Sequence, residues 1–238
     1  MSSLQRQRLG AVEVLRLNRP ERRNAMDSAL LSELLDALDE LSGDPALGAL
    51  IFSTTSERAL CAGADVSEQL DEAGGVARME AFARLYAAVE AFAAPTVAVC
   101  VGNCVGAGAE LAAGCDLRVG GDNLKLAWAG ARMGVPVGPA RLVPLTGLAT
   151  AKDLILTGRT IGMDEARALG LLHRTAPAAE AEAAALALAR EVAGHAPEGV
   201  RALKALFREL TGSAAHVAAE NVLLVDTQRG GGGLKSSP

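Results

Sequence analysis

The residues best suited to chemistry lie between Thr96 and Asp116, in the stretch TVAVCVGNCVGAGAELAAGCD. Its valines predict a buried strand, and its glycines predict a turn where backbone can approach a ligand closely. A short helix is expected to begin near Ala107, and the N–H groups at its start suit an anion or a developing oxyanion. Glu110 is the one charged residue of this helix. Because a lone carboxylate is unfavourable in apolar surroundings, Glu110 is a candidate acid or base.

A second loop of small residues, Ala59 to Val66 (ALCAGADV), follows the apolar predicted strand Ala49 to Ser53. Two such turns on neighbouring strands could each direct one N–H group at the same oxygen atom. That arrangement is an oxyanion hole.

Composition limits the function classes. At 238 residues, the chain is long enough for one large domain or for a domain with an appended helical part. A net charge of −5 argues against a nucleic-acid partner. No apolar run is long enough for a membrane span. The three histidines are too far apart in sequence to suggest a metal site, so no metal is expected.

Cysteine usage and the N-terminal sequence point to a cytoplasmic protein. The chain has no CxxC pair and opens with no signal-peptide pattern, so its cysteines are expected to be reduced.

Strands and helices, which must position these loops, are expected to alternate along the first half of the chain. Strands are expected at 12–18, 49–53 and 96–101, with helices from residue 28 to Gly43 and over 79–92. A break is expected at Gly74–Gly75. Two short strands, 116–119 and 124–128, are expected around a turn at Gly120–Gly121. This order suggests stacked βα layers.

The second half is expected to be helical. The predicted helices, which should cover a core or a subunit interface, are 141–156, 164–169, 178–193, 198–210 and 213–226. The final GGGGLKSSP is expected to be disordered.

Four stretches then match a known family in order and spacing: LNRPERRNAM (17–26), ALCAGADVSE (59–68), VGNCVGAGAELAAGCDLRV (101–119) and LTGLATAKDLILTGRTIGMDEARALGLLHR (145–174). Along nearly its whole length the chain resembles the enoyl-CoA hydratase/isomerase, or crotonase, superfamily. The resemblance implies an α/β fold in which repeated ββα turns form a right-handed superhelix. It also implies C-terminal helices that build a trimer, often paired into a hexamer.

On this basis we expect a spiral core over residues 1–195, a helical trimerisation region over 196–229 and a flexible tail over 230–238. The expected ligand is an acyl-CoA thioester, which is the substrate, and no separate cofactor is implied.

The resemblance also assigns residues. The N–H groups of Ala64 and Ala107 would be the oxyanion donors, and Glu110 matches the first of the two catalytic glutamates of hydratases. Coenzyme A would bind along 22–26 and 62–66. The expected substrate-binding set is Arg22, Ala25, Ala62, Ala64, Asp65, Val66, Ala107, Trp128 and Gly130.

One position departs from the hydratases. Their second glutamate corresponds to Gly130 in LKLAWAGARMGVP. Another polar residue, Glu68, Glu80 or Arg132, would have to reach the pocket instead. Hydration normally uses two carboxylates, so with one carboxylate the movement of a double bond is easier to explain.

Several of these residues could instead have structural roles. Glu110 could be paired with an arginine in a buried network, and Ala64 and Ala107 could be close-packing positions. Asp65 could stabilise its loop. Arg22 could be solvated rather than contact a phosphate, and Trp128 could be a core residue.

The favoured function is an enoyl-CoA hydratase or isomerase, that is, a lyase or isomerase of fatty acid metabolism. The competing functions are thioester hydrolysis or decarboxylation on the same scaffold, or acyl-CoA binding without catalysis.

Overall fold

A computed structural model of the chain describes residues 2–235. Its strands form two sheets. The six-stranded sheet has the order β1-β2-β3-β5-β7-β9, and the three-stranded sheet has the order β4-β6-β8. The strands are β1 (Leu4–Leu9), β2 (Val12–Leu17), β3 (Ala49–Thr54), β4 (Ala59–Cys61), β5 (Thr96–Cys100), β6 (Asn103–Val105), β7 (Leu117–Gly121), β8 (Lys125–Ala127) and β9 (Arg174–Ala176).

Helices follow the strands in a repeating order. The α-helices are α1 (Ser28–Ser42), α2 (Glu72–Ala91), α3 (Ala107–Gly114), α4 (Pro139–Thr146), α5 (Leu148–Thr157), α6 (Met163–Ala168), α7 (Ala181–Ala193), α8 (Pro197–Thr211) and α9 (Ser213–Arg229). Short 3₁₀ turns occupy η1 (Pro20–Arg22), η2 (Ala131–Met133) and η3 (Ala178–Glu180).

The repeat is a spiral of ββα turns. In each of the units β3-β4-α2, β5-β6-α3 and β7-β8-α4, the first strand joins the large sheet and the second joins the small sheet. Successive turns pair in parallel in both sheets. The loops after β4 and β6 therefore come from neighbouring strands of the small sheet.

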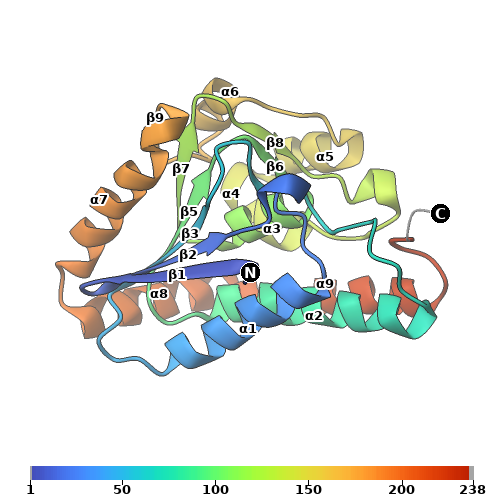
Figure 1. Cartoon of the computed structure of the whole chain (residues 1–238), viewed down its shortest axis with the longest axis horizontal. Coiled ribbons are helices and arrows are strands. Elements are labelled where there is room, and N and C mark those ends of the chain that lie inside the picture. The colour runs from blue at the N-terminus through green and yellow to red at the C-terminus, as the bar shows by residue number, and fades with distance from the viewer. Residues whose placement is uncertain (1, 236–238) are drawn as a thin grey trace.

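The central strands β3 and β5 of the large sheet are buried on both faces, which explains their continuous apolar sequences, whereas the edge strand β1 is largely exposed. The helix α7 covers one face, where Ala181, Ala185 and Ala189 pack on valines of β2 and β5. The helices α1, α2 and α3 contribute to the larger core on the other side. In Figure 1, α1 and α2 run along the lower edge with α9, and α7 stands at the left. Extensive contact between α2 and α9 fixes the C-terminal helix over the same core.

Two differences from the expected elements have clear physical causes. Gly120 and Gly121 lie inside β7 rather than in a turn, and β7 and β8 belong to different sheets. A Cβ atom at Gly121 would lie 2.8 Å from the side chain of Val101, so close packing rather than turning requires glycine there. Gly74 and Gly75 lie inside α2, because Asp71 caps this helix by accepting a hydrogen bond from the Gly74 N–H at 2.7 Å.

Other differences concern element limits. The expected helix 141–156 is divided at Gly147, which has a φ of +78°. The additional strands are β1, β9 and the short β4 and β6, which lie in segments predicted to be turns and pair with each other in the small sheet. In the segment expected to be flexible, residues 230–235 are described and the Leu234 side chain is buried against the core. The rest of that segment, 236–238, lies outside the described residues.

Candidate active site

Two residues with unengaged backbone N–H groups line one cavity. Ala64 follows β4 and Ala107 is the first residue of α3, and both line a cavity of about 280 Å³. Within the described chain, neither N–H group donates to another protein group. The glycines before them, Gly63 and Gly106, have φ values of +109° and +53°, which favour glycine. The structure thus brings together the two donors that the sequence predicted.

Backbone contacts keep the first loop in place. The Met26 N–H donates to the Gly63 carbonyl at 2.8 Å, and the Asp65 N–H donates to the Met26 carbonyl at 2.8 Å. Ala64 therefore lies between two anchored residues, so its N–H direction is fixed before any ligand arrives. Such preorganisation is what an oxyanion site requires.

The remaining cavity wall is apolar apart from one phenol. Met79, Phe82 and Tyr86 come from α2, and Leu224 comes from α9. The expected residues that also line the cavity are Ala62, Val66 and Gly130. A Cβ atom at Gly130 would lie 2.6 Å from the Val135 carbonyl oxygen, so this backbone leaves no room for the glutamate of the hydratases.

Glu110 is held by an arginine that the sequence analysis did not identify. Its side chain is only 1% exposed, and its Oε2 accepts a hydrogen bond from Nε of Arg141 at 2.6 Å. Arg141, in α4, also forms an ion pair with Glu220 of α9. The structural role considered for Glu110, a buried pair with arginine, is therefore present. Among the described residues no donor binds Oε1, and Glu110 is not itself one of the residues that line the cavity.

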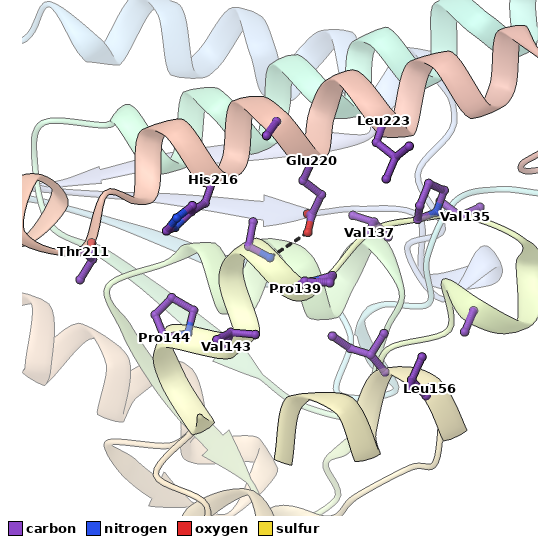
Figure 2. A pocket seen from close by; sticks show the side chains of 15 residues that line it. Val135, Val137, Pro139, Val143, Pro144, Leu156, Thr211, His216, Glu220 and Leu223 are labelled. Carbon is purple, nitrogen blue, oxygen red and sulfur yellow. Dashed lines mark hydrogen bonds between the residues drawn. The ribbon is translucent and has the colours of Figure 1, made fainter. Parts of the chain in front are cut away.

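The outer end of this network lies at a larger apolar groove between α4, α5 and α9. Figure 2 shows Glu220 projecting from α9, with a dashed line to the backbone N–H of Ala140. This hydrogen bond is 2.8 Å long. The groove has a volume of about 860 Å³ and contains Leu156 and Leu223, both exposed. Glu220 therefore connects the buried network to the surface.

Burial controls the charge of Glu110. Loss of solvation raises the pKa of Glu110 to about 7; the Arg141 cation opposes this rise, and the Glu220 anion adds to it. A carboxyl group with a pKa near neutrality can both take and return a proton at physiological pH. Tyr86 lies against the same network, with Cζ of Arg141 4.4 Å from its ring centroid.

Trp128 packs beside Glu110 and is not among the residues lining the cavity. Its side chain is buried, and an added Cβ at Gly138 would contact both Glu110 Oε1 and Trp128 Cδ1, at 3.1 and 3.2 Å. This position fits a core residue.

The predicted coenzyme A segment is partly occupied by internal contacts. Asp65 is buried and binds Arg19 at 3.0 Å and the Ser67 hydroxyl at 2.6 Å, which fits a loop-stabilising role. Ala25 accepts a hydrogen bond from Arg19 through its carbonyl. Arg22 is exposed, and no ion pair with another described residue engages it.

None of the three candidate replacements for the second glutamate lines the cavity. Glu68 accepts the Ser28 N–H at 3.1 Å and lies 3.6 Å from Arg78. Glu80 pairs with Arg229, and Arg132 contacts the Thr157 carbonyl.

Within residues 2–235, no three His, Cys, Asp or Glu side chains are grouped as metal ligands. In the same part of the chain, no helix is long and apolar enough to cross a membrane. The four cysteines are buried and unbridged.

Comparisons with known proteins agree with the fold and the loops. The model of the enoyl-CoA hydratase/isomerase family matches residues 7–229. A putative enoyl-CoA hydratase of Thermus thermophilus is 39% identical over 210 residues, which span 85% of this chain and 83% of that protein. A Bos taurus protein named enoyl-CoA hydratase domain-containing protein 2, mitochondrial, is 39% identical over 204 residues. These residues span 82% of this chain and 69% of that protein.

A solved structure confirms the expected crotonase fold. The crystal structure of an enoyl-CoA hydratase/isomerase from Xanthobacter autotrophicus Py2 superposes with a TM-score of 0.88. The match covers 98% of this chain and 89% of that chain. Because the two sequences are only 23% identical, the match supports the fold alone.

Proposed function

The chain belongs to the enoyl-CoA hydratase/isomerase family, and on this premise we propose that it converts an acyl-CoA thioester through an enolate. One observation carries the proposal. Ala64 and Ala107 line one cavity, their N–H groups make no hydrogen bond within the described chain, and Glu110 stands three residues after Ala107 on the same helix.

The chemistry follows from where charge develops. When a thioester loses an α-proton, negative charge moves onto its carbonyl oxygen, and two fixed N–H donors stabilise that oxygen. Removing one such donor costs about 10²–10³ in kcat in comparable sites. Glu110 would carry the proton through Oε1, since Arg141 occupies Oε2.

The single carboxylate favours movement of a double bond over addition of water. Hydration needs a second carboxylate to hold the water, and Gly130 stands in that place. One base can instead remove a proton from one carbon atom and return it to another. The competing outcomes are hydration, thioester hydrolysis, decarboxylation and acyl-CoA binding without turnover.

The coenzyme A moiety is proposed to follow residues 22–26 and 62–66. Arg22 and Arg23 are exposed cations beside the first loop, and phosphate groups favour such partners. Acyl-CoA is the proposed substrate, with no separate cofactor.

We further propose assembly into a trimer or a dimer of trimers. The helix α8 carries exposed apolar side chains along one side, Leu203, Leu206, Phe207 and Leu210. Such a continuous apolar surface is typical of an interface between subunits. The cytoplasmic location stays a prediction, because a relative is named as mitochondrial.

The deciding experiment follows ultraviolet absorbance of the conjugated enoyl thioester. With 3-hexenoyl-CoA, an isomerase produces the conjugated 2-enoyl signal; with crotonyl-CoA, a hydratase removes it. We expect the signal to appear from the first substrate faster than it disappears from the second. Release of free CoA thiol during loss of the crotonyl-CoA signal would instead show thioester hydrolysis. No change with either substrate, while both bind, would favour decarboxylation or binding without turnover.

A further inference from the structure

Leu234 closes part of the cavity wall from the C-terminal end of the chain. Gly230 to Gly233 follow α9, and Gly231 and Gly233 have φ values of +80° and +75°. These left-handed residues turn the backbone back toward the cavity. The Leu234 side chain is 6% exposed and lines the same cavity as the two oxyanion donors.

The Gln228 side chain holds the backbone of Leu234 in place. The Leu234 N–H donates to Oε1 of Gln228 at 3.0 Å, and Nε2 of Gln228 donates to the Leu234 carbonyl at 3.3 Å. Within the described chain, Leu234 has no other backbone hydrogen bond. The glycine turn before it is closed by backbone hydrogen bonds, from the Gly231 N–H to the Gln228 carbonyl at 3.1 Å and from the Gly232 N–H to the Thr227 carbonyl at 3.0 Å. Leu234 itself, held by one amide and its apolar contacts, can therefore move away at little cost compared with a helix or strand.

The position of Leu234 relates it to the acyl group. A thioester oxygen bound by Ala64 and Ala107 leaves the acyl chain to extend along the apolar wall. That wall consists of side chains from α2 and α9 together with Leu234. The cavity has a volume of about 280 Å³ with Leu234 in place, so this side chain narrows the space left for the far end of an acyl chain.

We propose that Leu234 sets the longest acyl chain that the closed cavity accepts, and that longer chains enter only when the Gln228 contacts open. This makes Leu234 a specificity-determining residue. The inference rests on the proposed function only in requiring an acyl-CoA ligand.

The test measures Kd by calorimetry for saturated acyl-CoAs from butyryl-CoA to dodecanoyl-CoA. Each further methylene that becomes buried should tighten Kd about fourfold until the cavity is full. Leu234→Ala removes three carbon atoms. We expect it to move the length at which Kd levels off by about two carbons, so that a chain of that length binds roughly tenfold more tightly than to wild type.

Two further variants test whether a shift in the chain-length limit reflects the size of residue 234 rather than a change in folding. Leu234→Phe should move the limit to shorter chains, and Gln228→Ala should move it to longer ones. The matched control is Leu188→Ala, which removes the same atoms from a residue 7% exposed in the core beneath α7. It should leave the limit unchanged.

The outcomes separate this inference from the proposed function. If wild type binds acyl-CoAs but all variants share its length limit, the role of Leu234 is refuted and the proposed function stands. If wild type binds no acyl-CoA, the proposed function itself fails.

Discussion

Nε of Arg141 lies 2.6 Å from Oε2 of Glu110, and both side chains are almost completely buried. Because Arg141 also pairs with Glu220, one cation serves two carboxylates. The three groups carry a net charge of −1 when both glutamates are ionised. A proton on Glu110 makes the group neutral, which is one reason why this carboxyl holds its proton up to about pH 7.

The pH dependence of kcat/KM should shift in opposite directions when Arg141 and Glu220 are replaced. As a base, Glu110 acts only when ionised, so kcat/KM should rise with pH and level off above about 7. Arg141→Met removes the cation that favours the ionised form, which raises the pKa of Glu110 and moves the rise to higher pH. Glu220→Gln removes an anion, so the rise should move to lower pH.

Steady-state kinetics between pH 5 and 9 would measure both shifts, with circular dichroism as a check on folding. Equal loss of activity in both variants without opposite shifts would contradict the proposed role of the network.

Glu110→Gln should abolish most turnover while leaving acyl-CoA binding. The amide keeps the shape of the side chain but cannot accept a proton, and loss of such a group costs about 10²–10⁴ in rate. Rates with 3-hexenoyl-CoA and Kd for hexanoyl-CoA would be measured in parallel. Unchanged turnover would leave Glu110 with only its structural pairing.

Ala107→Pro tests a backbone donor directly. Proline is tolerated at the first position of a helix, and it removes the N–H group that faces the cavity. We expect kcat to fall by about a hundredfold or more. Ala107→Gly, which keeps the donor, should retain most of the activity. The oxyanion assignment would be wrong if both variants behaved alike.

Phe207→Glu should weaken subunit assembly. It places a charge in the middle of the exposed apolar side of α8, where burial of an unpaired carboxylate is unfavourable. Light scattering after size exclusion would compare its mass with that of wild type. The exposed Leu148→Glu exchange on α5 adds the same charge outside this side of α8 and serves as control. A wild-type monomer would rule out the proposed trimer.

The loops of the site can be predicted from sequence because glycine patterns and alternating apolar residues are local signals. The turns at Ala64 and before Ala107 depend on nearby residues and are predicted, although the short strands 59–61 and 103–105 that lead into them are not. Arg141 and Glu220 escape prediction because their ion pairs join residues 31 and 79 positions apart. A signal is present for Arg141, since it is the one charged residue in VPVGPARLV.

The buried position of Leu234 also escapes prediction, because the sequence around it indicates a flexible segment. Four consecutive glycines indicate disorder when only local sequence is considered. The structure uses their conformational freedom for a tight reversal, and only the Gln228 side chain, six residues earlier, shows why the reversal is held. Gly120 and Gly121 likewise indicate a turn, although packing against neighbouring elements is what requires them.

Because the proposed oxyanion donors are backbone groups, they limit which positions can change in related sequences. A Cβ atom at Gly108 would overlap the carbonyl oxygen of Cys61 and lie 2.9 Å from its side chain, so α3 and the end of β4 meet almost backbone to backbone. An N–H donor does not depend on the side chain that accompanies it. Positions 64 and 107 can therefore vary among small residues over evolution, whereas selection should retain glycine at 108, a residue that takes no part in the reaction.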